Sequence, residues 1–340
     1  MTRDGERLSD DCLEVKPSEV RLDISSLCQL RCVLCPVAHR DGQAFIGRGV
    51  LPLSSFREFI DANPGVRTLE IGSSGEIFLN RDLPAMLRYA HDKGVKIQID
   101  QGSNLNDASP EALEALVKYG VSILKVSIDG ATQETYEKYR VGGDLRKVLG
   151  NVRAINGHKK RHGSVLPRLI LQFIPFGHNE HEIGRIIVMS KALGMEIYFK
   201  INVFDEHLPL RDHTLLTKLI GYSDTSSFFR KTGMIYMRHV CLQLWRSPQV
   251  SWDGRLLGCS HNVHGVFAQD ALGGRFAQEV NNERMRYARM MHLGTVPGRE
   301  DIPCTSCEVF ADYRKYDQWL TPDEIRQAMD RPDPYAHTIG

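Results

Sequence analysis

Short apolar runs alternate with amphipathic stretches over the first 200 residues of the chain. The apolar runs predict six β-strands, over residues 21–24, 67–71, 95–99, 123–128, 169–174 and 196–201. Between the strands, apolar residues recur at helical spacing and predict helices over residues 53–63, 82–93, 109–120, 145–159 and 180–193. This alternation of strand and helix predicts an α/β fold with a parallel sheet built from βα units.

The periodicity weakens after about residue 210, and this change divides the chain. Residues 1–17 are charged and lack clear periodicity, which predicts an N-terminal arm. We expect the sheet domain over residues 18–225 and a smaller, cysteine-containing domain over residues 226–320. A helix and a loose tail are expected over residues 321–340, because Thr321 and the Pro-Asp-Glu after it are typical of a helix start.

The composition is that of an ordinary globular enzyme. Of the 340 residues, 42% are hydrophobic and 25% are charged, and 43 basic against 42 acidic side chains leave a net charge of +1. This balance gives no overall field that would attract nucleic acid. No apolar run is long enough to span a membrane, and the polar N-terminus is unlike a signal peptide. We therefore expect a cytoplasmic protein that binds neither nucleic acid nor a membrane.

Three cysteines lie close together directly after the first predicted strand. Cys28, Cys32 and Cys35 have the spacing C-x3-C-x2-C, and thiolates are soft ligands suited to zinc or to iron–sulfur clusters. Three thiolates are one short of a closed zinc site, whereas they would leave one iron of a four-iron cluster open to a small molecule. An odd number of cysteines also disfavours disulfides. A zinc site with a distant fourth ligand stays open as the alternative.

Four more cysteines lie in the predicted C-terminal domain, at Cys241, Cys259, Cys304 and Cys307. Four thiolates can complete one metal site, and a zinc ribbon is the alternative to a cluster. Zinc ribbons usually use two C-x2-C pairs, however, and only one such pair is present. Residues 252–256, Trp-Asp-Gly-Arg-Leu, predict a β-hairpin between Cys241 and Cys259, because Asp-Gly favours a tight hairpin turn.

The first cysteine loop resembles that of the radical S-adenosylmethionine (radical SAM) superfamily, which binds a [4Fe-4S] cluster through three cysteines. The resemblance implies that SAM chelates the open iron. It also implies that an external one-electron reductant, such as flavodoxin or ferredoxin, drives SAM cleavage to a 5′-deoxyadenosyl radical. The six predicted βα units then match the superfamily's partial (β/α)6 TIM-like barrel, although the strand pattern alone would also allow a doubly wound sheet.

Further motifs lie at the ends of predicted strands, where α/β enzymes bind their ligands. Ser74-Gly75-Glu76 resembles the superfamily's Gly-Gly-Glu motif, which implies that Glu76 lies near the SAM amino group. Ser127 and Arg140 match a Ser-x-Asp-Gly turn and a later arginine, which implies SAM contacts and, for Arg140, an ion pair with the SAM carboxylate. Gln101 lies in a stretch that partly matches a Thr-Asn-Gly turn. Without the resemblance, a solvent-exposed helix face would be the default for Arg140.

The second cysteine set resembles the auxiliary-cluster region of SPASM and twitch-type radical SAM enzymes. A full SPASM domain has seven cysteines, and this chain has four of them, which implies the twitch type with a second, fully ligated [4Fe-4S] cluster. The order of the cysteines and the hairpin is similar to that of the dehydrogenases that act on 2-deoxy-scyllo-inosamine in aminoglycoside antibiotic biosynthesis. The resemblance therefore implies an oxidoreductase whose second cluster accepts an electron from the substrate.

Polar residues near strand ends are candidate contacts for a small-molecule substrate, most simply a sugar or an aminocyclitol. They are Gln172, Asn202 and His261, and solvent exposure or loop polarity would explain each as well. Lys200 is a candidate catalytic residue. Cys12 fits a structural thiol best, but it could also donate a hydrogen atom to a substrate radical.

Three alternative functions remain open: a sugar epimerase, a peptide maturase, and a non-catalytic zinc- or cluster-binding electron carrier. About twenty residues precede the first predicted strand, which is too few for a peptide-recognition domain. We therefore expect an enzyme that oxidises an alcohol to a ketone by two electrons, rather than a peptide maturase.

Overall fold

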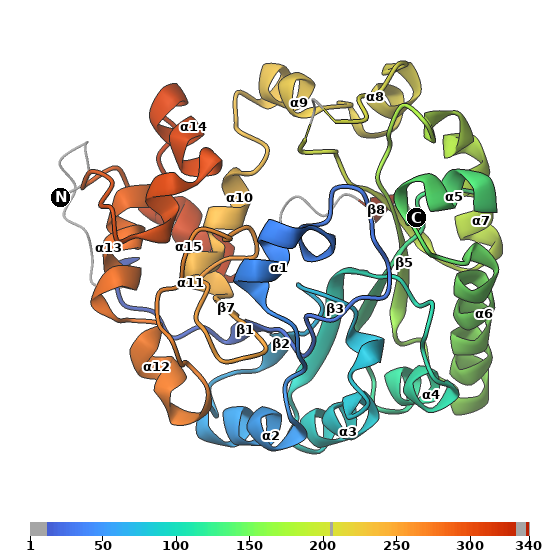
Figure 1. Ribbon diagram of the computed structural model, residues 1–340, viewed down its shortest axis with the longest axis horizontal. Coiled ribbons are helices and arrows are strands. Elements are labelled where there is room, and N and C mark those ends of the chain that lie inside the picture. The colour runs from blue at the N-terminus through green and yellow to red at the C-terminus, as the bar shows by residue number, and fades with distance from the viewer. Residues whose placement is uncertain (1–11, 205–206, 331–337, 340) are drawn as a thin grey trace.

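The computed structural model describes residues 12–204, 207–330 and 338–339. Its centre is an eight-stranded sheet in the order β7-β1-β2-β3-β4-β5-β6-β8 (Figure 1). Seven strands run parallel, and β8 pairs antiparallel with β6. The strands are β1 (Glu19–Leu22), β2 (Thr68–Glu70), β3 (Lys96–Ser103), β4 (Ile123–Ser127), β5 (Arg168–Phe173), β6 (Glu196–Phe199), β7 (Gln249–Val250) and β8 (Thr338–Ile339).

Helices connect successive strands and cover the outside of the sheet (Figure 1). Those of the N-terminal part are α1 (Arg40–Ile46), α2 (Leu53–Ala62), α3 (Leu83–Asp92), α4 (Pro110–Lys118), α5 (Gln133–Tyr139), α6 (Leu145–His162) and α7 (Ile183–Ala192). Those that follow β6 are α8 (Thr214–Ile220), α9 (Thr225–Thr232), α10 (Arg238–Cys241), α11 (Gln243–Arg246), α12 (Phe276–Glu279), α13 (Glu283–His292), α14 (Glu308–Tyr316) and α15 (Pro322–Asp330). Short 3-10 helices are η2 (Pro36–Ala38), η3 (Ile77–Leu79), η4 (Glu180–Glu182), η5 (Gly273–Arg275) and η6 (Pro303–Ser306).

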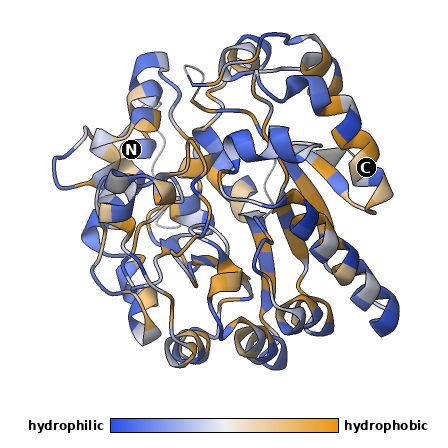
Figure 2. Ribbon diagram, turned by 45° about the vertical axis from the view of Figure 1, so that its right-hand side comes forward, coloured by the Kyte–Doolittle hydropathy of each residue, from blue (hydrophilic) through white to orange (hydrophobic). Residues whose placement is uncertain are grey.

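The hydrophobic core lies between the sheet and these helices. Helix α2, for example, buries Phe56, Phe59 and Ile60 on one face, as expected for an amphipathic surface helix. Figure 2 shows the same separation, with hydrophobic residues along the strands and hydrophilic residues on the outer helices. The predicted α/β class and partial barrel are therefore confirmed. No helix among the described residues is long and apolar enough to cross a membrane.

Several predicted strand ends differ from the structure. Strand β1 ends at Leu22 and β6 at Phe199, each two residues before the predicted end. Strand β3 instead continues past Ile99 to Ser103, with a register shift against β4. Gly102 has φ of +105° there, a backbone conformation that glycine adopts at little cost and that is typical of bulges. The predicted turn around Gln101 is therefore wrong, because this bulge lets the strand continue.

A seventh parallel strand was absent from the sequence prediction. Strand β7 pairs with β1, with Arg21 opposite Gln249 and Leu22 opposite Val250. The turn predicted over residues 252–256 follows it, but its two sides share one isolated antiparallel bridge between Val250 and Leu256. The C-terminal segment is thus joined to the barrel by main-chain hydrogen bonds, and the predicted domain boundaries stay a prediction.

The end of the predicted N-terminal arm packs against the C-terminal helices. Cys12 and Val15 are buried. The Trp245 indole donates to the Cys12 carbonyl at 2.6 Å, and the Val15 amide donates to Asn281 Oδ1 at 2.9 Å. The rest of the arm, residues 1–11, lies outside the described residues. Burial of Cys12 among core side chains supports its interpretation as a structural thiol.

Candidate active site

The loop of the first cysteine set follows β1 and is held by three separate segments. The Arg31 amide donates to the Val141 carbonyl at 2.9 Å, and the Val33 amide donates to the Tyr139 carbonyl at 3.2 Å. On the other side, the Glu76 amide donates to the Leu27 carbonyl at 2.6 Å. Cys32 is buried in a small apolar cluster with Leu30, Tyr139 and Phe176. The fold thus fixes this loop at the carboxyl end of β1, the edge where α/β proteins bind ligands.

The three thiols of this loop lie close together and next to polar donors. Arg140 Nη1 donates to Cys32 Sγ at 3.6 Å, and Asn104 Nδ2 donates to Cys28 Sγ at 3.7 Å. Burial raises the pKa of Cys28 to about 12, and the charges of Glu76, Cys32 and Cys35 act in the same direction. Buried thiols of this kind become thiolates when they bind a metal. None of the eight cysteines, all of which are described, forms a disulfide. The donor set therefore fits an iron–sulfur cluster.

The Ser74-Gly75-Glu76 segment packs directly on the loop of the first cysteine set. Gly75 has φ of +64°, and a β-carbon at this position would lie 2.7 Å from the Ser25 carbonyl oxygen. Only glycine fits such a position without a shift of the backbone.

Glu76 is fully buried, and protein donors already bind its carboxylate. Ser103 Oγ donates to Oε1 at 2.7 Å, and the Asn104 amide donates to Oε2 at 2.6 Å. Burial raises the Glu76 pKa, and these hydrogen bonds oppose the rise. Glu76 therefore holds the end of β3 beside Cys28, and its contact with the SAM amino group stays a prediction.

Arg140 has a protein partner that the sequence interpretation did not assign. Its Nε donates to Asp129 Oδ2 at 2.5 Å, and the other Asp129 oxygen accepts from the Ile174 amide at 2.7 Å. Burial lowers the Arg140 pKa, but the Asp129 and Cys32 charges outweigh it and raise the pKa well above its usual value. The alternative of a solvated helix face is therefore wrong for Arg140. Asp129 is the aspartate of the Ser-x-Asp-Gly turn, so this partner could have been found from the motif.

We expect Arg140→Lys to weaken SAM binding by roughly 10- to 100-fold, which corresponds to one lost hydrogen bond between charged groups. Lysine keeps the positive charge beside Asp129 but loses the planar fork that suits a carboxylate. The measurement is the SAM dissociation constant of the reconstituted protein, with iron content as the control. Unchanged SAM affinity would show that Arg140 has only the structural partner Asp129.

Ser127 and Gln172 lie side by side at the ends of β4 and β5. They are opposite each other in the sheet register, and Gln172 Nε2 donates to Ser127 Oγ at 3.3 Å. A β-carbon at Gly102 would lie 2.5 Å from Ser127 Oγ and 2.7 Å from Gln172 Nε2. The β3 bulge therefore places the backbone of Gly102 directly against the Ser127 and Gln172 side chains. Gln101, beside Gly102, is half-buried.

Charged side chains occupy the next positions around the strand ends. Lys125, two residues before Ser127 and so on the same face of β4, forms an ion pair with Asp100 at 2.7 Å. Its ammonium group also lies 4.2 Å from the centre of the Tyr198 ring. Lys200 follows β6, and burial lowers its pKa to about 8, with the Lys125 and Arg140 charges acting in the same direction. A lysine with this pKa can exchange a proton near neutral pH.

The other two substrate candidates have local partners. Asn202 Nδ2 donates to the Phe204 carbonyl at 3.1 Å and to the His207 carbonyl at 2.7 Å. It also lines a pocket of about 220 Å³ between the loops that follow β5 and β6. His261 pairs with Glu308 at 2.6 Å. Neither placement tests a substrate contact, which stays a prediction for both residues.

The four cysteines of the second set come together from three separate segments of the chain. Cys241 ends α10, Cys259 follows the turn after β7, Cys304 lies in η6, and Cys307 precedes α14. Burial raises the pKa of Cys304 well above its usual value, and the charges of the other three cysteines raise it further. Burial likewise raises the Cys259 pKa to about 12, while Arg21 opposes the rise. Four thiols this close can hold one metal centre.

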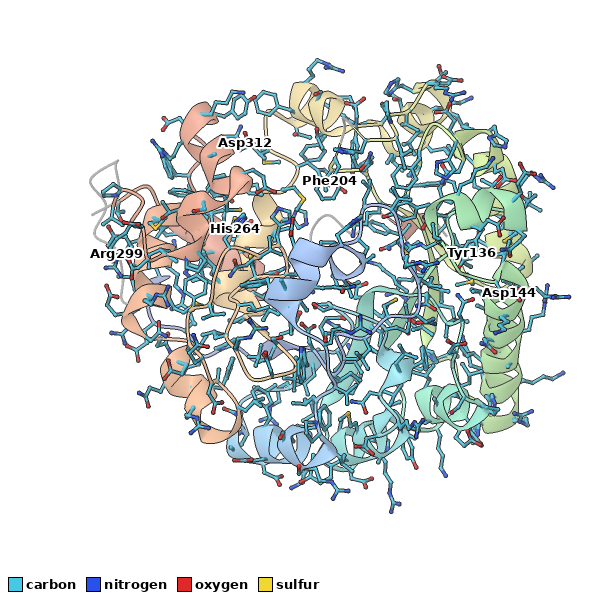
Figure 3. The ribbon with its side chains drawn as sticks, viewed as in Figure 1. Tyr136, Asp144, Phe204, His264, Arg299 and Asp312 are labelled. Carbon is cyan, nitrogen blue, oxygen red and sulfur yellow. The ribbon has the colours of Figure 1, made fainter. Side chains whose placement is uncertain are left out.

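The C-terminal helices lie on one side of the molecule, and α5 and α6 lie on the other (Figure 1). In Figure 3, His264 and Asp312 lie on the side of the C-terminal helices, whereas Tyr136 and Asp144 lie on the opposite side. The former pair is close in sequence to Cys259 and Cys307, and the latter pair encloses Arg140.

Comparison with known proteins shows which family the N-terminal part of the chain resembles. Residues 22–188 match the family model of the radical SAM superfamily. The chain is 24% identical over 310 residues to a GTP 3′,8-cyclase of Marinobacter nauticus, a match that covers 82% of this chain and 89% of that protein. It is 28% identical over 141 residues to the AdoMet-dependent heme synthase of Methanosarcina barkeri, and this match covers 41% of this chain and 39% of that protein.

Two solved structures share the fold of this chain. Streptococcus suis SuiB bound to the precursor peptide SuiA has a TM-score of 0.63 at 11% identity, over 88% of this chain and 72% of that one. The structure described as native anSMEcpe with bound AdoMet has a TM-score of 0.55 at 14% identity, over 92% of this chain and 99% of that one. Residues 22–188, slightly less than half of the chain, thus match a radical SAM domain, and the two solved structures show the shared fold alone. SAM and one [4Fe-4S] cluster are the cofactors that this family implies, and Cys28, Cys32 and Cys35 fit the cluster.

Proposed function

We propose that this chain is a radical SAM oxidoreductase of the twitch type that oxidises an alcohol of a small polar substrate to a ketone. The convergence of Cys241, Cys259, Cys304 and Cys307 is the observation that carries the proposal. Four thiolates would complete a second [4Fe-4S] cluster and leave no open iron for substrate. Electron transfer is the role that suits such a cluster best, and a sugar or an aminocyclitol, as for 2-deoxy-scyllo-inosamine dehydrogenases, is the substrate class.

The first cysteine set would hold the cluster that binds SAM. With an electron from a reductant such as flavodoxin or ferredoxin, that cluster supplies reductive cleavage of SAM to a 5′-deoxyadenosyl radical. Arg140 would orient the SAM carboxylate, because Asp129 accepts from its Nε and Cys32 Sγ from its Nη1, which leaves Nη2 for a further acceptor. The buried cluster of Leu30, Tyr139 and Phe176 would keep water away from one side of the loop.

The polar side chains at the strand ends would bind the substrate and accept its proton. Oxidation removes one hydrogen atom from carbon, which goes to the 5′-deoxyadenosyl radical, one proton from the hydroxyl group, and one electron. Lys200 is the proposed proton acceptor, because its pKa of about 8 leaves part of it neutral near neutral pH. The second cluster, when bound, supplies the acceptor for the electron. Gln172 and Ser127 offer hydrogen bonds to further substrate hydroxyl groups.

Nucleotide cyclisation is a second candidate function. The match to the GTP 3′,8-cyclase of Marinobacter nauticus covers most of both chains, which favours a related reaction. The match to the heme synthase covers less than half of either chain and gives less support. Epimerisation and peptide modification use the same hydrogen abstraction, so the products must distinguish these functions.

The test is turnover of the anaerobically reconstituted protein in D₂O with SAM, a reductant, and either 2-deoxy-scyllo-inosamine or GTP. For oxidation, we expect equal amounts of 5′-deoxyadenosine and ketone. The ketone should carry no new carbon-bound deuterium, apart from any that solvent exchange later introduces on the carbon atoms next to the carbonyl group. A product of unchanged oxidation state, with one new carbon-bound deuterium at an inverted centre, would show that the chain is an epimerase and not a dehydrogenase. Conversion of GTP alone would favour the cyclase, and absence of any SAM cleavage would favour the electron carrier.

A further inference from the structure

Buried polar residues join β1 of the barrel to the segment that carries Cys259. Asp23, which is fully buried, links two of the regions described above. Its Oδ1 accepts from the Ser74 amide at 3.1 Å, and its Oδ2 accepts from Gln249 Nε2 at 2.8 Å. The Ser74-Gly75-Glu76 segment is thus connected through one carboxylate to β7. We call Arg21, Asp23, Ser73 and Gln249 the β1–β7 junction.

Cys259 follows a non-strand segment that lies beside β7, the edge strand of the sheet. Arg21 is opposite Gln249 in the sheet, and the Gln249 and Gly258 backbones exchange two hydrogen bonds, of 3.3 and 3.2 Å. Neighbouring backbones in a sheet are about 4.8 Å apart, so the Arg21 backbone lies roughly 10 Å from that of Gly258. Cys259 is the next residue, and among the influences on its pKa the Arg21 charge is a minor one that opposes the rise caused by burial. Arg21 therefore lies between the barrel strands and the second cysteine set.

The guanidinium of Arg21 is buried without a carboxylate partner. Its Nη1 donates to Ser73 Oγ over a long distance of 3.4 Å, and its Nε has no hydrogen-bond partner in the part of the chain that the structure describes. Among the described residues, no carboxylate oxygen lies within the 4.0 Å of an ion pair. The nearby carboxylate of Glu70 accepts instead from the Gly72 and Asp100 amides at 2.9 and 2.7 Å.

A buried, unpaired cation is costly to a fold unless an anion compensates it. Burial raises the pKa of both Asp23 and Glu70 and the Arg21 charge opposes the rise, but within the described ranges neither carboxylate forms an ion pair with Arg21. A four-iron cluster with four thiolate ligands is an anion, and it gains one further negative charge on reduction. A fixed positive charge nearby stabilises the reduced form more than the oxidised form.

We propose that Arg21 is the counter-charge of the second cluster and raises its reduction potential, so that the cluster accepts an electron from the side of the barrel. This inference rests on the proposed function, because it requires the second cluster. Arg21 acts here as a positioning residue through its charge, and it takes no part in the chemistry at the substrate.

The test is a redox titration of the second cluster, followed by electron paramagnetic resonance. The starting protein is the Cys28→Ala, Cys32→Ala, Cys35→Ala variant, in which the second cluster alone contributes a signal. Adding Arg21→Gln should lower the equilibrium constant for reduction by about tenfold, which is about 59 mV for a one-electron couple. Arg21→Lys keeps the charge and should restore most of the potential. Arg168→Gln is the matched control and should leave the potential unchanged, because Arg168 pairs with Glu196 on the far strands β5 and β6.

The outcomes separate this inference from the proposed function. If the starting variant folds but holds no iron, the second cluster is absent, and both the proposed function and this inference fail. If it holds iron and Arg21→Gln leaves the potential unchanged, this inference alone fails. If the starting variant does not fold, the same titration is done on the complete protein with and without SAM, since SAM changes the spectrum of the first cluster only.

Discussion

Replacing Cys28, Cys32 and Cys35 together by alanine is expected to abolish SAM cleavage and to remove about half of the bound iron, four of roughly eight atoms. The three thiolates would be the ligands that leave one iron open, so their loss would remove the site at which SAM would bind. The measurement is 5′-deoxyadenosine formed under reducing conditions, together with iron per chain.

Cys12→Ala is the matched control for this change. Cys12 is almost completely buried, at 1% exposed. Its backbone carbonyl, and not its thiol, accepts the hydrogen bond from Trp245. The variant should keep its iron and its SAM cleavage, with at most a small loss of stability from the shortened side chain. Retained SAM cleavage in the triple variant would refute the assignment of the first cluster. Loss of turnover in folded Cys12→Ala would instead support a hydrogen-donating role and hence an epimerase.

Replacing Cys304 and Cys307 by alanine is expected to abolish product formation while SAM cleavage continues without it. The second cluster would lose two of its four ligands, and the substrate radical would lose its electron acceptor. The first cysteine loop should keep its function, because its supports come from Val141, Tyr139 and Glu76 rather than from the C-terminal segment. The measurement is the ratio of ketone to 5′-deoxyadenosine, which should fall from about one toward zero.

Metal binding and folding are coupled in small cysteine-rich segments, so this variant needs a test of its structure. Tyr313 in α14 is fully buried, and its hydroxyl donates to the Arg238 carbonyl at 2.7 Å, which links α14 to α10 independently of any metal. Circular dichroism and thermal unfolding should confirm that the variant is folded. A folded variant that lacks the second cluster but still forms ketone at the normal ratio would refute the role of this cluster as electron acceptor.

Local periodicity explains why the barrel could be predicted from the sequence. The strands β1 to β6 are short apolar runs, and helices such as α2 have one clear apolar face, so these elements were visible within their own residues. The helices α1 and α5, of seven residues each, were not predicted from periodicity. Strand β7 is only two residues long, and a segment of that length has no periodicity to detect. Its place in the sheet depends on pairing with β1, which is more than 200 residues earlier in the chain.

The candidate site was predictable where its residues are neighbours in sequence. The spacing of Cys28, Cys32 and Cys35 is local, and so the loop could be recognised from the sequence. The link from Ser74 through Asp23 to Gln249 spans a sequence separation of 226 residues on one side, and no local pattern shows it. Asn104 beside Cys28 also escaped prediction, because the bulge at Gly102 directs it to the first cysteine loop.

The most direct test of two cluster sites in one chain is quantification of iron, sulfide and zinc in the anaerobically reconstituted protein, with a Mössbauer spectrum of the same sample. We predict roughly eight iron and eight sulfide per chain and a spectrum of cubane clusters. About one zinc per chain with little iron, or four iron that all depend on Cys28, Cys32 and Cys35, would contradict the presence of two clusters.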